Sequence, residues 1–203
     1  MKRNEYGGLL VAFDGPNGVG KSTLIEQVKS ELNSHGIEIF ITKEPSDTQL
    51  GCFTRQIAEH LDGESLTCLV AADRYHHLNE TVIPQLQAGK IVIMDRYILS
   101  SLILQCMDGV ETEFVLAVNN NIIIPDIQVA VKANVSTLRT RLNERIELTR
   151  FERGQRSSEE LRFMDLGIDV LRKRKVNVLE VDNTGNLTES VSVIIKKLLE
   201  VSE

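Results

Sequence analysis

Five short apolar runs recur along the chain, and each is too short to be a typical helix. They cover residues 9–13, 37–42, 91–94, 127–131 and 176–181. Short, mostly apolar runs are typical of strands that are buried on both faces of a parallel sheet. The pattern therefore predicts five buried parallel strands.

The segments between these runs carry apolar residues at helical spacing. We expect helices over residues 20–35, 48–61, 65–87, 98–107, 112–119, 135–148, 158–175 and 187–201. Gly36 and Gly89 stand where helix stops belong, and Asn186 with Glu189 forms a capping-box-like start for the last helix. Strands that alternate with helices indicate an α/β fold, in which helices flank a five-stranded parallel sheet in three layers.

Length and composition change this picture little. A chain of 203 residues with 42% hydrophobic content is long enough for one sizeable core, so we expect a single domain over residues 1–203. Three cysteines are too few and too scattered for a disulfide framework or a zinc site. Without a signal-peptide pattern or a bilayer-length apolar segment, the chain is expected to be cytoplasmic and not bound to membranes.

Charge is distributed unevenly along the chain. The net charge of −6 argues against non-specific binding to nucleic acid. Residues 132–156 nevertheless hold seven cations and three anions, which leaves about −10 for the rest of the chain. The cations are Lys132, Arg139, Arg141, Arg145, Arg150, Arg153 and Arg156, and the anions are Glu144, Glu147 and Glu152. An Arg-dense segment in an acidic protein indicates a small phosphorylated ligand.

A glycine-rich segment follows the first apolar run. Residues 15–22 read Gly-Pro-Asn-Gly-Val-Gly-Lys-Ser, and this G-x-x-x-x-G-K-S spacing lets main-chain N–H groups and a helix N-terminus face phosphate oxygens. Lys21 would reach the β- and γ-phosphates, and the Ser22 hydroxyl would hold Mg²⁺. The ATP-binding residues expected in this segment are Gly15, Asn17, Gly18, Val19, Gly20, Lys21, Ser22 and Thr23.

Charged residues follow most of the predicted strands. Residues 14–21, 43–45, 95–97 and 182–183 come directly after strands one, two, three and five. Ligands of parallel α/β sheets bind outside the carboxyl ends of the strands. We therefore expect these segments to converge on one rim.

The sequence resembles the thymidylate kinase family over nearly its whole length. Besides the phosphate loop, several blocks stand in the family's order: Thr-Lys-Glu-Pro at 42–45, Ala-Ala-Asp-Arg at 71–74, Asp-Arg-Tyr-Ile-Leu-Ser-Ser at 95–101, Gln105, Pro-Asp at 125–126 and an Arg-rich segment. The resemblance implies a P-loop kinase of nucleoside monophosphates. Such an enzyme uses ATP and Mg²⁺ to convert dTMP to dTDP, usually as a homodimer, and has a mobile Arg-rich lid, here residues 141–157.

The resemblance also implies roles for individual residues. Asp95 would organise Mg²⁺ with Ser22, Arg96 would hold the acceptor phosphate, and Asp182 would lie near adenine. The catalytic residues expected on this basis are Lys21, Asp95, Arg96, Arg145 and Arg150. The residues expected to bind the acceptor are Asp14, Glu44, Val70, Arg74, Arg96, Ser100, Ser101, Leu104 and Gln105.

One subdivision of the family depends on where a catalytic arginine stands. Some members carry it in the phosphate loop and others carry it in the lid. The corresponding loop position here is Gly18, so the resemblance assigns this charge to the lid. Arg145 and Arg150 are the best-aligned candidates, ahead of Arg141 and Arg153.

Four positions depart from the family pattern, and all of them fall in the acceptor pocket. Val70 replaces an aromatic residue that stacks on thymine, a loss of about 1 kcal/mol in base affinity. Leu104 replaces a tyrosine that crowds the sugar 2′ position, and Asn17 replaces an acidic residue of the loop. Lys43 replaces the commoner arginine. Nucleotide kinase chemistry survives these changes, but the identity of the base and sugar does not follow.

Three alternative functions remain open. In a nucleoside kinase of the same superfamily, Glu44 would act as general base on a 5′-hydroxyl. Arg74, Arg96 and Lys43 instead favour an anionic acceptor. A nucleotide-dependent switch would need no small-molecule acceptor. A degenerate member that binds nucleotide without turnover is suggested by the departures at Val70, Leu104 and Asn17.

Overall fold

The computed structural model describes residues 1–146, 148–153 and 156–202. The expected lid, residues 141–157, thus contains three positions, Glu147, Gly154 and Gln155, that lie outside the described residues.

Within the described residues, five strands form one parallel sheet, which confirms the fold predicted from the apolar runs. They are β1 (Leu9–Asp14), β2 (Ile39–Lys43), β3 (Ile91–Asp95), β4 (Ile127–Lys132) and β5 (Val178–Asp182). Their order is β2-β3-β1-β4-β5. Because β1 pairs with both β3 and β4, the loop that follows β1 lies at the centre of the carboxyl edge of the sheet.

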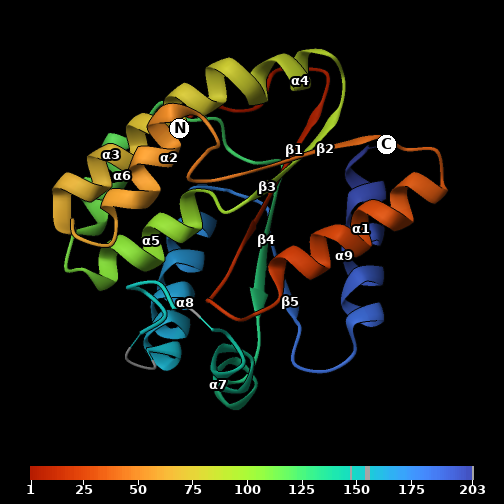
Figure 1. The fold of residues 1–203 in the computed structure, drawn as a ribbon. Helices are drawn as coiled ribbons and strands as arrows, with labels where there is room; N and C mark the ends of the chain where they lie inside the picture. The colour runs from red at the N-terminus through yellow and green to blue at the C-terminus, as the bar shows by residue number, and fades with distance from the viewer. Residues whose placement is uncertain (147, 154–155, 203) are drawn as a thin grey trace.

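Helices cover both faces of the sheet (Figure 1). They are α1 (Lys21–Ser34), α2 (Gln49–Ile57), α3 (Gly63–His77), η1 (Leu78–Val82), α4 (Ile83–Gln87), α5 (Ile98–Met107), α6 (Thr112–Val118), α7 (Val135–Asn143), α8 (Ser157–Lys173) and α9 (Leu187–Ser202). Helices α1 and α9 lie side by side on one face, and α5 and α8 cover the other.

Two hydrophobic cores result, one on each face of the sheet. Successive residues of β1 alternate between them: Leu10 and Ala12 join the core under α5 and α8, whereas Val11 and Phe13 join the core under α1 and α9. The side-chain alternation of a strand thus explains why the central strand is apolar at every position from Leu9 to Phe13.

The long helix predicted over residues 65–87 is interrupted. A π-helical turn, η1, joins α3 to α4, and the Ile83 N–H donates to the carbonyl oxygen of Leu78, five residues earlier. Pro84 follows at the start of α4 and has no N–H to continue the regular ladder. Apolar spacing alone does not reveal such a turn, because the turn keeps Leu78 and Val82 buried.

The helix predicted over residues 135–148 is also shorter than expected. Helix α7 ends at Asn143, and the Arg145 N–H turns back to the carbonyl oxygen of Leu142. Ile146 is fully exposed, so no core contact supports a further helical turn there.

Helix ends follow the local signals that were identified. Gly36 and Gly89 have positive φ angles of 76° and 77°, as glycines after helices commonly do. Asn186 Oδ1 accepts a hydrogen bond from the Thr188 N–H at 3.0 Å, at the start of α9. No helix in the described part of the chain combines the length and apolar character needed to cross a bilayer.

Candidate functional site

The loop after β1 is compressed against its surroundings. A Cβ atom on Gly15 would lie 2.2 Å from the carbonyl oxygen of Val131, so a larger residue does not fit there. Gly20 has φ of 92° and precedes the first residue of α1. The side chain of Asn183, just after β5, donates to the Val19 carbonyl oxygen at 2.8 Å. The loop therefore requires glycine at these positions to place its amides around an anion.

Lys21 is folded back onto this loop. Its Nζ donates to the carbonyl oxygens of Gly15 and Pro16 at 3.0 and 3.2 Å, and the residue is only 7% exposed. Burial, together with the nearby charge of Arg96, lowers the pKa of Lys21 to about 7. Asp95, Asp14 and Glu160 oppose this shift only in part, and a bound phosphate would add opposite charge next to the ammonium.

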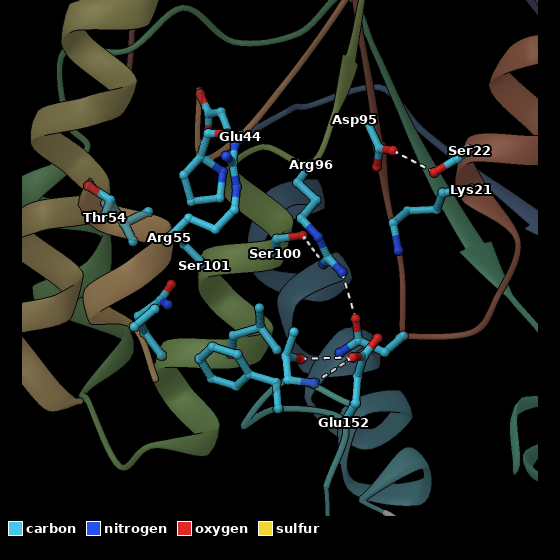
Figure 2. Close-up of a pocket in the computed structure, with 18 of the residues that line it drawn as sticks. Lys21, Ser22, Glu44, Thr54, Arg55, Asp95, Arg96, Ser100, Ser101 and Glu152 are labelled. Atoms are coloured by element: carbon cyan, nitrogen blue, oxygen red, sulfur yellow. Dashed lines mark hydrogen bonds between the residues drawn. The ribbon is translucent and has the colours of Figure 1, made fainter. Parts of the chain in front are cut away.

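Ser22 and Asp95 meet at the carboxyl edge of the sheet. Ser22 lies in the first turn of α1, and its Oγ donates to Asp95 Oδ2 at 2.9 Å (Figure 2). Among the described residues, no group of three or more His, Cys, Asp or Glu side chains is placed to hold a metal. One hydroxyl and one carboxylate nevertheless fit Mg²⁺, which takes oxygen ligands and usually completes its shell with substrate phosphates and water.

Arg96 has an unusual backbone conformation at the end of β3. Its φ of 75° lies in the left-handed region, which is strained for a residue with a side chain, and its N–H donates to the Phe13 carbonyl oxygen at 2.9 Å. The guanidinium donates to Ser100 Oγ at 3.2 Å and to Asn17 Oδ1 at 2.7 Å. Figure 2 shows Arg96 and Lys21 extending into the same region.

Glu160 is a residue of this region that sequence reasoning missed. It lies in the first turn of α8 and is only 2% exposed. Its Oε2 accepts the Asn17 N–H at 2.7 Å and its Oε1 accepts Asn17 Nδ2 at 3.3 Å. Burial raises the pKa of Glu160. Asn17 stands at the loop position where the resemblance led us to expect an acidic residue. The Glu160 carboxylate lies beside it, but it is supplied by helix α8 and not by the loop.

Arg74 forms a buried ion pair beneath the acceptor side. Its Nε donates to Glu44 Oε2 at 2.7 Å, and its terminal nitrogens donate to Asn119 Oδ1, the Tyr97 carbonyl oxygen and Ser101 Oγ at 2.7, 3.2 and 3.1 Å. Burial acts to lower the pKa of Arg74, but the charge and hydrogen bond of Glu44, together with Tyr97 and Asp14, outweigh it and the pKa is raised. The guanidinium expected to reach the acceptor is thus largely committed to protein partners.

Asp73, the neighbour of Arg74, received no role from the sequence. Its carboxylate accepts the Ser46 N–H at 2.7 Å and the Ser46 hydroxyl at 2.6 Å, and it is 1% exposed. These bonds fix the segment after β2 to helix α3. The two polar residues of the Ala-Ala-Asp-Arg block thus hold together elements that are far apart in the sequence.

Asp14 lies beneath the site and not in it. It is fully buried and accepts hydrogen bonds from the N–H groups of Tyr97 and Ser100 at 2.8 and 3.0 Å, from the Ser100 hydroxyl, and from Gln128 Nε2 at 2.9 Å. Asp14 therefore fixes the first turn of α5, which carries residues that do line the site.

One cavity of about 450 Å³ brings most of the expected residues together. Those that line it are Asn17, Gly18, Gly20, Lys21, Ser22, Thr23, Glu44, Val70, Arg74, Asp95, Arg96, Ser100, Ser101, Leu104, Gln105 and Arg145. The expected residues outside its lining are Asp14, Gly15, Val19, Arg150 and Asp182. Asp182 is exposed at the end of β5, and its Oδ1 accepts the Thr184 N–H at 2.8 Å.

The two leading arginine candidates have different surroundings. Arg145 lines the cavity and forms an ion pair with the buried carboxylate of Glu152. Arg150 instead donates to both carboxylate oxygens of Asp108 at 3.0 and 2.9 Å and to the Ala58 carbonyl oxygen at 2.8 Å. Only Arg145 of these two therefore faces the cavity.

Arg141 approaches the phosphate loop from α7. Its guanidinium donates to the carbonyl oxygens of Val19 and Asn183 at 3.0 and 3.1 Å. The side chain thus links the phosphate loop to the segment that follows β5.

Comparisons with known proteins identify the family. The sequence profile of the thymidylate kinase family matches residues 13–194. A probable thymidylate kinase of Caldivirga maquilingensis is 38% identical over 149 residues, which cover 71% of this chain and 73% of that protein. A probable thymidylate kinase of Thermococcus onnurineus is 29% identical over 206 residues, which cover 95% of this chain and 100% of that protein. The chain belongs to the thymidylate kinase family.

Proposed function

We propose that the protein transfers the γ-phosphoryl group of ATP to the 5′-phosphate of dTMP, giving dTDP and ADP. Membership of the thymidylate kinase family makes the chain a phosphotransferase that acts on nucleotides. One observation carries the proposal: a phosphate loop and a second set of cations share a single cavity, which Lys21, Arg96 and Arg145 all line. Two anions can be held there against each other.

On the donor side, the loop amides and the Lys21 ammonium bind the β- and γ-phosphates. Ser22 and Asp95 are the residues that would hold Mg²⁺, which neutralises charge on these phosphates when it is bound. Asp182 and the residues after it lie at the sheet edge where adenine is expected, and Arg141 connects that segment to the loop.

On the acceptor side, Arg96 holds the 5′-phosphate of dTMP. An oxygen of that phosphate attacks the γ-phosphorus, a new P–O bond forms, and the bond from the γ-phosphorus to the β–γ bridging oxygen breaks. ADP leaves with the electron pair of that bond. The attacking oxygen is already anionic near neutral pH, so the transfer requires no general base.

Arg145 is the candidate for stabilising charge on the transferring phosphoryl group. It faces the cavity, and Gly18 leaves the loop without a side chain for this purpose. Arginines in this role contribute about 10³- to 10⁵-fold to kcat in phosphoryl transfer. Arg150 would have to leave Asp108 to take the same role.

A nucleoside kinase is the competing function, and one observation favours it. Glu44 lines the cavity, and its buried Oε1 has no hydrogen-bond partner among the described residues, with His77 Nδ1 3.8 Å away. Its other oxygen is held by Arg74. A 5′-hydroxyl acceptor would need such a base, whereas Arg96 would then face no anion. The cationic acceptor side favours the monophosphate.

A coupled ADP-release assay with ATP and Mg²⁺ tests the proposal. We expect turnover with dTMP, little with thymidine, and only slow ATP hydrolysis without an acceptor. Arg96→Ala should lose transfer, whereas Arg139→Ala, which removes an exposed arginine of α7, should keep it. Turnover with thymidine alone would favour the nucleoside kinase, and hydrolysis that no acceptor changes would favour a nucleotide switch.

The proposal extends to a homodimer, the assembly that the resemblance to the family implies. Sedimentation velocity at several protein concentrations tests it, and a monomer throughout would contradict it.

A further inference from the structure

The acceptor end of the cavity has aliphatic walls. Leu66 and Val70 project from α3 and Leu104 from α5, and none of them offers a π face to a base. Of the described residues that line the cavity, Phe151 is the only aromatic one. It comes from the Arg-rich segment between α7 and α8 and not from the helices that form the walls.

Phe151 is held in place through its neighbour Arg150. The Arg150 guanidinium carbon lies 4.1 Å from the centroid of the Phe151 ring, so a cation covers one face of the ring. The same guanidinium is bound by both oxygens of Asp108, and the Arg150 N–H donates to Glu59 Oε1 at 3.0 Å. Glu59 follows α2 and Asp108 follows α5, so these contacts place the segment at the acceptor end of the cavity.

A second anchor follows Phe151 in the sequence. Glu152 is 6% exposed and accepts the N–H and hydroxyl of Thr149 at 2.9 and 3.0 Å. It also pairs with Arg145. Phe151 therefore stands between two residues, Arg150 and Glu152, whose side chains are fixed by charge-assisted hydrogen bonds. Because the segment is already ordered, little conformational entropy is lost at Phe151 when a ligand binds.

We propose that Phe151 stacks on the base of the acceptor nucleotide and so replaces the aromatic contact that Val70 cannot make. This inference rests on the proposed function. Arg150 covers one face of the ring, which leaves one face for one planar ring system. Because Glu152 joins Phe151 to Arg145, a stacked base also fixes the arginine that faces the transferring phosphoryl group.

Acceptor kinetics give the first test. Replacing Phe151 with Leu should raise KM for dTMP about 5- to 150-fold, the range found when a base loses its stacking partner, and leave KM for ATP unchanged. Phe151→Tyr keeps the ring and should stay close to the unsubstituted enzyme. The matched control is Phe53→Leu, which alters a half-exposed phenylalanine of α2 that does not line the cavity. An unchanged KM for dTMP in Phe151→Leu would overturn the inference.

Fluorescence gives a test that does not depend on turnover. The chain has no tryptophan, so Phe151→Trp and Phe53→Trp each carry a single reporter. Titration with dTMP should quench the tryptophan at 151 and leave the one at 53 unchanged, whereas ribose 5-phosphate should quench neither. If calorimetry shows that dTMP binds but the tryptophan at 151 does not respond, the stacking inference is wrong while the proposed function stands. If dTMP does not bind to the unsubstituted protein, both fail.

Discussion

The two sides of the cavity are built in different ways. The donor side is one continuous loop, residues 15–22, whose main-chain shape depends on glycines at positions such as Gly15 and Gly20. The acceptor side is assembled from α2, α3, α5 and the Arg-rich segment, and buried charges such as the Arg74–Glu44 pair hold it together. Substitutions on the donor side should therefore affect chemistry, and substitutions under the acceptor side should affect stability.

The largest expected effect is on the donor side. Lys21→Ala should lower kcat for phosphoryl transfer by about 10³-fold, because it removes a buried charge from the phosphates where negative charge develops. Its free energy of unfolding should not fall, since burial already disfavours the charged lysine and lowers its pKa. Stopped assays and urea unfolding measure the two effects. Lys196→Ala, at an exposed position of α9, is the control, and a large stability loss in Lys21→Ala would contradict the comparison.

The largest stability effect is expected under the acceptor side. Arg74→Ala should reduce the free energy of unfolding by about 3–5 kcal/mol, because it leaves the Glu44 carboxylate buried without its partner. Lys197→Ala removes a partner of the more exposed Glu200 pair and should cost less than about 1 kcal/mol. Urea unfolding of both variants gives the difference. Equal, small losses would show that Arg74 is not a structural residue.

The sequence predicted the main-chain shape of the donor side better than the side-chain partners on the acceptor side. Residues 15–22 are contiguous, so their spacing already implied a loop between a strand and a helix, and Ser22 and Asp95 meet as expected. For Arg74 and Asp14 the motif identified the residues but not the buried protein groups with which they form hydrogen bonds. A motif indicates which residue types are needed near a site, and packing decides what each one contacts.

Contacts between distant segments had no sequence signal. Glu160 stands 143 positions from Asn17, and only the packing of α8 brings the two together. Likewise, the π-helical turn η1 is compatible with the same apolar spacing as a regular helix. Local periodicity therefore predicted the elements, whereas the partners of buried polar groups required the fold.

A smaller stability loss is expected for Asp73→Ala. The substitution removes two charge-assisted hydrogen bonds from Ser46 and leaves the Ser46 N–H buried without this acceptor. The free energy of unfolding should therefore fall by about 2–3 kcal/mol. Glu200→Ala, on the exposed face of α9, serves as the control in the same urea titrations. Because Asp73 does not line the cavity, kcat at saturating substrate should change by less than about threefold. The loss of one hydrogen-bond donor that acts in the transition state would instead lower kcat by about 10²- to 10³-fold. A fall in kcat without a loss of stability would show that Asp73 takes part in catalysis.

The smallest expected effect is the uptake of a proton by Lys21 when nucleotide binds. This uptake reports on the donor side alone, because Lys21 belongs to the phosphate loop. With a pKa of about 7 before nucleotide binds, Lys21 is mostly neutral at about pH 8, and the phosphates of MgATP raise that pKa when they bind. Binding should then take up about 0.9 proton at about pH 8 and only about 0.1 at about pH 6, where Lys21 is already charged.

Calorimetry in two buffers with different ionisation enthalpies measures this uptake. Lys21→Arg, whose guanidinium stays charged at both pH values, subtracts the protons bound by the nucleotide and by other groups. Equal uptake by the lysine and arginine proteins at about pH 8 would mean that the ammonium is already charged before nucleotide binds, held by the carbonyl oxygens of Gly15 and Pro16.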